Sequence, residues 1–135
     1  CTTKIYIIVG TNAVAVGQVR FDLVNASWEI DFSIDIAFRG QGLATNALRL
    51  GIEEVCISAH AVSFVGRVKK DNYKSQTVFQ KLGFDLKVKD NYYFYSLEIN
   101  PSWHPNCNKL ARKFYQEQSH VQRNVHITQR YHSST

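Results

Sequence analysis

Hydrophobic and polar residues alternate along much of the first hundred residues, as is typical of strands with one buried face. The segments KIYIIV (4–9) and AVAVGQVRFDLV (13–24) are rich in β-branched and aromatic residues and are separated by a turn, so they predict a hairpin. Residues 28–36 (WEIDFSIDI) alternate strictly and predict a third strand. Its apolar face would carry Ile30, Phe32, Ile34 and Ile36, and its polar face Glu29, Asp31, Ser33 and Asp35.

The period of the apolar residues changes after the third strand. Over residues 43–59 they recur every three or four positions, which predicts a helix with one buried stripe. The stripe would consist of Ala44, Leu48, Ile52, Val55 and Ala59. A further strand is predicted over AVSFVGRV (61–68).

A second helix and a closing hairpin complete the pattern. Asp71 or Asn72 can cap this helix, and Gly83 stands where a left-handed residue would end it. The segments FDLKVK (84–89) and YYFYSLEI (92–99) predict the hairpin. The order of elements predicts an α+β fold, with a mixed, mostly antiparallel sheet, flanking helices and one strand-helix-strand crossover.

A chain of 135 residues that is 44% hydrophobic fits one compact domain with a hydrophobic core. It has no run of about 18 apolar residues and no signal-peptide pattern, so we expect a cytoplasmic protein without a membrane partner. The three cysteines, Cys1, Cys56 and Cys107, are odd in number and far apart, which favours free thiols over a disulfide framework.

The net charge of +5 is concentrated near the end of the chain. Residues 1–100 contain 11 Lys or Arg and 10 Asp or Glu, whereas residues 101–135 contain 5 and 1. We therefore predict a nearly neutral domain over residues 1–99 and a basic extension over 100–135, solvated rather than bound to nucleic acid. One helix is predicted in the extension by the stripe Cys107, Leu110, Ala111, Phe114 and Tyr115.

Four residues of the extension have a spacing similar to that of a zinc finger: His104, Cys107, His120 and His126. In one straight helix Cys107 and His120 would lie about 20 Å apart, at about 1.5 Å per residue, which is too far to share a metal ion. The sequence therefore predicts no metal site.

Two glycines lie between the third strand and the first helix, in AFRGQGLA (37–44). A helix N-terminus has unpaired N–H groups and a partial positive charge, and glycine lets a phosphate approach the backbone closely. The ATP-type loop is excluded because no Gly-Lys-Ser or Gly-Lys-Thr occurs, and the dinucleotide fingerprint fits poorly because it would end on Thr45. Arg39, Gly42 and Ala44 fit Arg/Gln-x-x-Gly-x-Gly/Ala, the loop that holds the pyrophosphate of coenzyme A. A turn that merely needs glycine is the alternative.

A second block follows in the expected order, with Asn72 and Ser75 before a closing Leu-Gly-Phe at residues 82–84. Together with GQVRFD and EIDFSIDIAFRGQGLA, this block resembles the GNAT superfamily of N-acetyltransferases over residues 4–99. The resemblance implies the GNAT fold, acetyl-CoA as cofactor and direct transfer of the acetyl group to an amine. The family's usual first strand and the helices after it are expected to be missing, because the first segment of this sequence matches the family's second strand.

The resemblance also implies a cofactor site. Ile34 and Ile36 would pair their backbone with the pantetheine arm, and Asn72 and Ser75 would lie along that arm near the thiol. The loop residues expected to hold the pyrophosphate are Arg39, Gly40, Gln41, Gly42, Leu43, Ala44 and Thr45. A backbone N–H of the strand would stabilise the oxyanion.

The group that protonates the leaving thiolate is not marked by the sequence. Many relatives have a tyrosine for this role where this chain has Phe79. The candidates that replace it are Ser75, Tyr73 and Tyr92, and the thiolate can also leave unaided or take a proton from water.

Two carboxylates are candidates for the general base. Glu29 aligns with the glutamate that often acts on this strand, and Asp31 lies two residues further on the same face. A solvent-exposed polar face is the alternative for both residues.

The expected acceptor is a small-molecule amine. The order of motifs looks most like acetyltransferases that act on nucleotide-linked amino sugars, so an amino sugar nucleotide is the narrower expectation. The alternatives are acetylation of proteins or peptides, and a non-catalytic module that binds acyl-CoA. A second copy of the chain, forming a homodimer, is a further candidate partner.

Overall fold

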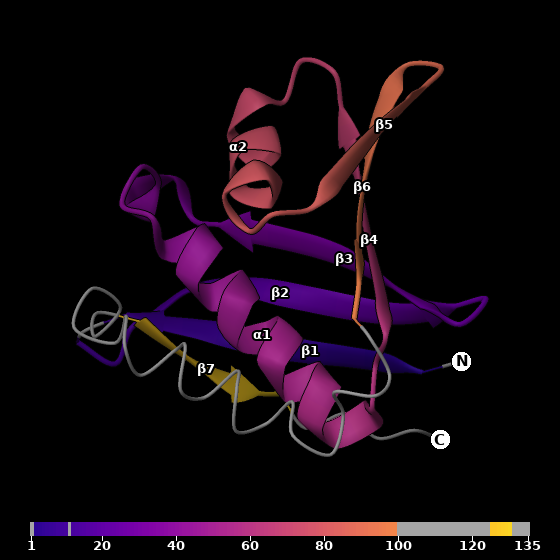
Figure 1. Ribbon diagram of the computed structural model, residues 1–135. Helices are drawn as coiled ribbons and strands as arrows, with labels where there is room; N and C mark the ends of the chain where they lie inside the picture. The colour runs from indigo at the N-terminus through magenta and orange to yellow at the C-terminus, as the bar shows by residue number, and fades with distance from the viewer. Residues whose placement is uncertain (1, 11, 100–124, 131–135) are drawn as a thin grey trace.

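The computed structural model of the chain describes residues 2–10, 12–99 and 125–130. Within these ranges two α-helices and one 3₁₀ turn combine with seven strands (Figure 1). The strands are β1 (Thr3–Gly10), β2 (Ala15–Val24), β3 (Ser27–Ile34), β4 (Ser63–Lys69), β5 (Asp85–Lys89), β6 (Tyr92–Glu98) and β7 (Val125–Gln129). The helices are α1 (Leu43–Ala59) and α2 (Tyr73–Lys81), and the 3₁₀ turn is Ile36–Phe38.

The described strands form one sheet in the order β5-β6-β4-β3-β2-β1-β7. Neighbouring strands are antiparallel except β3 and β4, which are parallel and are joined by α1. Helix α2 connects β4 to β5, and β6 lies between those two strands. The prediction of a mixed, mostly antiparallel sheet with flanking helices is confirmed.

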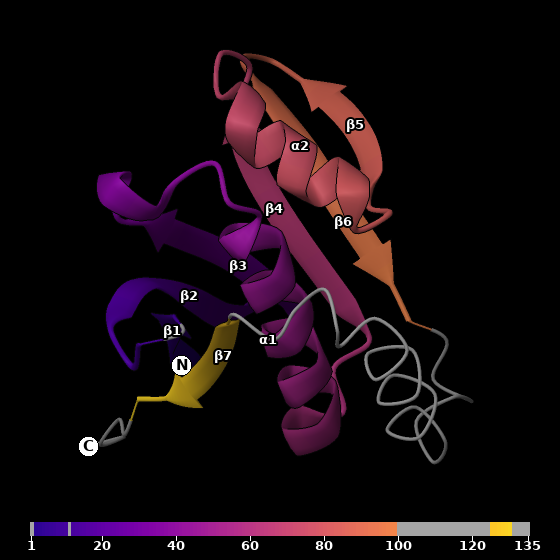
Figure 2. The same cartoon turned by 90° about the vertical axis from the view of Figure 1, so that its left-hand side faces the viewer.

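Both helices lie on one face of the sheet (Figures 1 and 2). On this face Phe21 of β2 is paired in register with Ile30 of β3, which is paired with Gly66 of β4. Helix α1 packs closely on Phe21, since a Cβ added at Gly51 would lie 2.9 Å from the Phe21 ring. The Phe79 ring of α2 packs on Gly66 in the same way. This layer is the core, and its largest fully buried side chains include Tyr95, Phe21, Phe64, Phe79, Ile8 and Leu48.

Both helices begin and end where the sequence predicts. The side chain of Asn72 accepts a hydrogen bond from the backbone N–H of Ser75 (3.2 Å) and so caps α2. Gly83, just after α2, has a φ of +81°, a conformation that favours glycine. The buried side of α1 is centred slightly differently from the prediction and consists of Leu43, Ala47, Leu48, Gly51, Val55 and Cys56. In the part of the chain that the structure describes, no helix is long and apolar enough to cross a membrane.

Strand β3 ends at Ile34, two residues earlier than predicted. The N–H of Asp35 donates to the carbonyl of Val16 (2.8 Å), and the N–H of Phe38 donates to the carbonyl of Asp35 (2.8 Å). These bonds turn the chain out of the sheet. Ile36 is 80% exposed in the 3₁₀ turn, so its predicted place on the apolar face of the strand was wrong.

Strand β7 was not predicted from the sequence. It pairs antiparallel with β1, from Tyr6 opposite Gln129 to Gly10 opposite Val125. Val125 is buried against the body, so residues 125–129 belong to the same sheet as the first hundred residues. The helix predicted from Cys107 to Tyr115 lies outside the described residues.

Candidate functional site

A fork opens in the sheet between β3 and β4. The two strands pair only from Trp28–Ile30 to Phe64–Gly66. Beyond that point β3 still pairs with β2 as far as Ile34, and β4 still pairs with β6 as far as Lys69. Figures 1 and 2 show the two strands diverging. The end of β3 therefore has a strand edge that β4 does not cover.

The glycine loop leads into α1 beside this fork. Gly40 and Gly42 have φ values of +82° and +74°, and Gly42 is the N-cap residue without a side-chain cap. The first backbone bond of α1 runs from the N–H of Asn46 to the carbonyl of Gly42 (3.3 Å), so the N–H groups of residues 43–45 have no partner within the helix. A Cβ added at either glycine would have no atom within 4 Å. Open space therefore faces a set of backbone donors at the positive end of a helix, which suits an anion.

Arg39 fixes the loop to the end of the strand. Its Nε donates a hydrogen bond to the carbonyl of Ile34 (3.0 Å), which satisfies the last acceptor of β3. The guanidinium group thus lies where the strand edge and the loop meet, with its other N–H groups available to a ligand.

Helix α2 forms the facing wall, and Gln76 holds its start in place. The Gln76 side chain is only 7% exposed, and its Nε2 donates to the carbonyls of Lys69 (3.2 Å) and Lys70 (2.9 Å). These bonds tie the first turn of α2 to the end of β4. Asn72 and Ser75, which the cap brings together, lie on the side of α2 that faces the fork.

The loop, the strand edge and α2 enclose a cleft of about 490 Å³. Its lining comes from residues 32–34, 38–40 and 42–45 and from Asn72, Lys74, Ser75, Thr77, Val78 and Lys81. Three of these residues, Arg39, Lys74 and Lys81, are cations, and none is a carboxylate. The cleft therefore has the charge and the donors to hold an extended, negatively charged ligand.

Nine of the eleven residues predicted to bind the cofactor line this cleft: Ile34, Arg39, Gly40, Gly42, Leu43, Ala44, Thr45, Asn72 and Ser75. The other two, Ile36 and Gln41, lie outside its lining. Besides residues of the strand and the turn, the sequence reasoning missed four lining residues of α2: Lys74, Thr77, Val78 and Lys81. Their spacing of three and four residues is a signal that these side chains share one face of a helix.

The two carboxylates predicted as bases lie on the other face of the sheet, away from α1 and α2. Glu29 and Asp31 are exposed, and neither has a hydrogen bond or an ion pair within the described residues. Glu29 is flanked by Asp22 and Val65 in the fully paired part of the sheet. Asp31 is the first residue of β3 beyond the last pairing with β4, so it stands at the apex of the fork.

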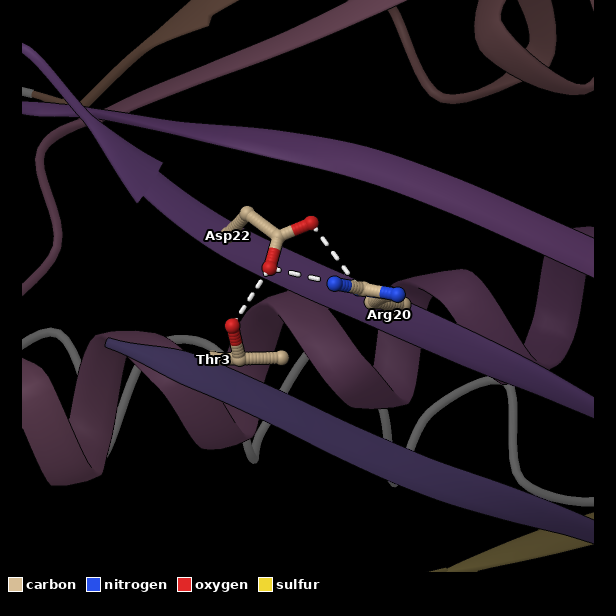
Figure 3. A network of polar contacts seen from close by, with 3 residues as sticks. All are labelled: Thr3, Arg20 and Asp22. Carbon is tan, nitrogen blue, oxygen red and sulfur yellow. Dashed lines mark hydrogen bonds and ion pairs between the residues drawn. The ribbon is translucent and has the colours of Figure 1, made fainter. Parts of the chain in front are cut away.

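A polar network holds the neighbouring carboxylate, Asp22, on the same face (Figure 3). Its Oδ1 accepts hydrogen bonds from Thr3 Oγ1 (2.6 Å) and Arg20 Nε (3.2 Å), and its Oδ2 lies 2.9 Å from the same nitrogen. Arg20 is paired in register with Asp31, yet it forms its ion pair with Asp22. The network therefore fixes Asp22 and leaves Asp31 un-neutralised among the described residues.

Phe79, which stands where many relatives have the tyrosine, and the three candidate proton donors lie in different surroundings. Phe79 is buried, with its ring stacked on Tyr95 (5.3 Å between centroids) and against Phe84 (5.0 Å). Tyr73 is 72% exposed, and Tyr92 lies below the guanidinium of Arg67 (5.1 Å). Neither tyrosine lines the cleft. Of the three candidates, only Ser75 does.

A second cavity, of about 400 Å³, lies between α1 and the pair β1–β7. It contains Tyr6, whose pKa is raised to about 12, first by burial and then by the charge of Glu54, while a hydrogen bond with Ser58 acts in the opposite direction. His126, one of the four residues of the zinc-like spacing, also lines it, whereas the other three lie outside the described residues. In the described ranges no three His, Cys, Asp or Glu residues are close enough to hold a metal ion.

Comparison with known proteins identifies this arrangement. The profile of a family described as an acetyltransferase (GNAT) domain matches residues 2–85. No curated protein sequence matches the chain significantly.

Several solved structures share the fold. A ribosomal L7/L12 alpha-N-protein acetyltransferase (RimL) in complex with coenzyme A superposes with a TM-score of 0.65 at 21% identity, over 73% of this chain and 63% of that one. A variant of the spermidine N-acetyltransferase SpeG from Vibrio cholerae gives 0.62 at 14% identity, over 77% and 69%. The microcin C7 self-immunity acetyltransferase MccE, in complex with acetyl-CoA and AMP, gives 0.57 at 26% identity, over 70% and 61%. The chain thus spans less than two thirds of the first and third of these proteins.

The resemblance seen in the sequence motifs is confirmed by these comparisons. The family profile covers well over half of the chain, and the solved structures share its overall fold. The chain belongs to the GNAT acetyltransferase family.

Proposed function

We propose that the chain binds acetyl-CoA in the cleft and transfers the acetyl group directly to a primary amine, in a complex that holds both substrates. The observation that carries this proposal is the fork between β3 and β4, with the glycine loop and the N-terminus of α1 beside it. Membership of the GNAT family supports the same activity, as do structural neighbours whose descriptions name coenzyme A or acetyl-CoA.

The residues present fit this cofactor. An extended arm with amide groups can pair with the uncovered edge of β3 as an added strand would. Arg39 and the backbone N–H groups of residues 40–45 would hold the pyrophosphate, because no side chain fills the space beside Gly40 and Gly42. Asn72 and Ser75 would bind the arm from the facing wall. The backbone at Ile36 and Gln41, outside the lining, would contribute least.

When bound, acetyl-CoA supplies a thioester as the acyl donor. The chain's own residues would orient this group and hold protons at defined places. A backbone N–H at the fork would donate a hydrogen bond to the thioester carbonyl oxygen, where negative charge increases during transfer. Ser75 is the proposed proton donor to the leaving sulfur, because it is the candidate hydroxyl in the cleft lining.

The amine must lose a proton, and the carboxylates on the open face are the proposed acceptors. Asp31 stands at the apex of the fork, and Glu29 lies two residues earlier on the same face. Because no cation neutralises either residue within the described part of the chain, both are available as bases. The acceptor would approach from this face, opposite α1 and α2.

The acceptor that we propose is a small-molecule amine, with an amino sugar nucleotide as the narrower expectation. Acetylation of protein N-termini is the second candidate, because the neighbour RimL is described as an alpha-N-protein acetyltransferase. Another neighbour is described as a spermidine N-acetyltransferase, so the shared fold is compatible with either size of acceptor. A module that binds acyl-CoA without catalysis is the third candidate.

One screen separates these candidates. The purified chain is incubated with acetyl-CoA and with amino sugar nucleotides, polyamines, peptides with free N-termini, or no acceptor, and the release of free CoA thiol is measured. Release that depends on a small amine supports the proposal, and release that depends on peptides supports protein acetylation. Tight binding of acetyl-CoA without release in any mixture would favour the non-catalytic module. Absence of binding would refute the cofactor assignment.

A further inference from the structure

The residues that α2 contributes to the wall of the cleft are regularly spaced. Lys74, Thr77, Val78 and Lys81 all line the cleft, and they are spaced at i, i+3, i+4 and i+7. Residues with this spacing lie on one side of a helix, one above another. The two lysines therefore stand at the two ends of one helical stripe, with Thr77 and Val78 between them.

Neither lysine is engaged elsewhere in the described part of the chain. No carboxylate lines the cleft, and neither Lys74 nor Lys81 has an ion pair or a hydrogen bond there. Arg39, the third cation of the cleft, already donates to the carbonyl of Ile34 on the opposite wall. Two of the three cations that line the cleft therefore belong to α2, and these two have no partner in the described part of the chain.

The position of Lys74 is unfavourable for the helix itself. Lys74 lies in the first turn of α2, which contains no acidic residue, and the positive end of a helix dipole disfavours a cation there. Lys81 lies in the last turn, where the same dipole favours a cation, so its charge also has a purely local explanation. A side chain that departs from the local preference and also lines a cleft is typical of a functional position.

We propose that Lys74 and Lys81 bind the 3′-phosphate of the cofactor nucleotide. This inference rests on the proposed function, in which the loop and Arg39 hold the pyrophosphate. The 3′-phosphate is a monoester with a charge of about −1.5 to −2 near neutral pH, and lysine binds phosphate as a point charge. Two lysines seven residues apart have Cα atoms about 10 Å apart, at about 1.5 Å per residue, so both long side chains can reach one phosphate between them.

The consequence is selectivity for the carrier of the acyl group. The site distinguishes coenzyme A from carriers that have the same pantetheine arm but no 3′-phosphate. The uncovered edge of β3 and the glycine loop would contact the pantetheine arm and the phosphate next to it, which the carriers share. The lysine pair of α2 would contact the 3′-phosphate, which only coenzyme A has.

The test compares CoA with 3′-dephospho-CoA by calorimetry, in wild-type protein and in the double variant Lys74→Gln/Lys81→Gln. Wild-type protein is expected to bind CoA at least about tenfold more tightly, the lower end for hydrogen bonds to charged groups. In the double variant that preference falls to within about threefold, because CoA binding weakens while dephospho-CoA binding changes little. Glutamine keeps a polar side chain, one atom shorter than that of lysine, and removes the charge; circular dichroism shows whether α2 still forms.

The matched control is Lys87→Gln/Lys89→Gln on β5, which removes the same net charge from exposed positions outside the cleft. It is expected to leave both affinities within about twofold, because exposed charges at a distance are screened by salt. Equal binding of the two ligands by wild-type protein would overturn the inference and leave the proposed function intact. Equal loss of both ligands in the double variant, or the same loss in the control, would also overturn it. Failure of wild-type protein to bind either ligand would refute the cofactor site as a whole.

Discussion

The ring of Phe79 lies on the backbone of Gly66, in the space that the Cβ of any other residue at position 66 would occupy. The ring is buried and stacked on Tyr95, and it also contacts the rings of Phe32 and Phe84. Many GNAT relatives have a tyrosine at this position, but here a hydroxyl on the ring would point into packed protein near the apex of the fork. Phe79 itself does not line the cleft.

Phe79→Tyr is expected to destabilise the protein and not to raise its acetyltransferase activity. Adding an atom to a packed core typically costs about 1–3 kcal/mol, and the buried hydroxyl would also need a partner. Urea unfolding measures the loss, and Phe94→Tyr, on a half-buried position of β6, is the control that adds the same atom at a less packed site. A more active enzyme with unchanged stability would show that the ring does reach the cleft.

Gly42→Asp is expected to abolish acetyl-CoA binding while the fold survives. The new side chain would enter open space in the cleft, where its negative charge would repel the pyrophosphate. Gly83→Asp is the matched control, because Gly83 also has a positive φ and no atom within 4 Å of an added Cβ, but lies outside the cleft. Calorimetry with both variants separates backbone strain from loss of the site. Equal affinities in the two variants would contradict the loop assignment.

Glu29→Gln is expected to lower kcat/KM at neutral pH by at least about tenfold, a lower bound set below the factor of about 10²–10⁴ that general-base catalysis typically contributes. Acetyl-CoA binding should not change, and part of the rate should return as rising pH deprotonates the amine in solution.

Asp31→Asn, measured in parallel with Glu29→Gln, tests the residue at the apex of the fork. The variant with the larger loss of kcat/KM identifies the proton acceptor. Asp22→Asn is the control, because this carboxylate lies on the same face but is held by Thr3 and Arg20. Wild-type rates and pH profiles for both Glu29→Gln and Asp31→Asn would mean that this face is only solvated surface.

The raised pKa of Tyr6 predicts that the folded protein loses stability at high pH. Burial, followed by the charge of Glu54, raises its pKa from an ordinary value near 10 to about 12. Between these two values the unfolded chain loses the Tyr6 proton while the folded chain keeps it, so stability is full below about pH 10 and falls as the pH rises toward 12. The loss amounts to about 2–3 kcal/mol for two pKa units. Tyr6→Phe should flatten this part of the stability curve, as measured by urea unfolding from pH 9 to 12, and an unchanged slope would contradict the assignment.

Local chemistry accounts for the parts of the fold that could be predicted. The cap at Asn72 and the left-handed Gly83 are set by neighbouring residues, and the change of period at Leu43 marks a true helix start. The end of β3 could not be predicted in this way. The alternation continues through Ile36, but the N–H of Asp35 bonds with Val16 on a different strand, and such a contact has no signature in a local pattern.

Contacts between segments far apart in the sequence explain why strand β7 and the two lysines of the cleft were not predicted. Strand β7 pairs with β1, more than a hundred residues away in sequence, so neither segment alone indicates the partner. Lys74 and Lys81 line the cleft because α2 packs across the open end of the sheet, with Phe79 against Phe32 and Gly66. The sequence showed the spacing of these lysines but not the surface that they face.

The fork leaves part of a strand edge inside the sheet without a neighbouring strand. Exposed strand edges are templates for pairing with other chains, and proteins normally cover or charge them. A cofactor that pairs with β3 would cover this edge, and at a hundred times its Kd it would stabilise the fold by about 2.7 kcal/mol. The concentration of acetyl-CoA in the cell would then control the lifetime of this protein as well as its rate of turnover, since chains without cofactor would aggregate or be degraded first.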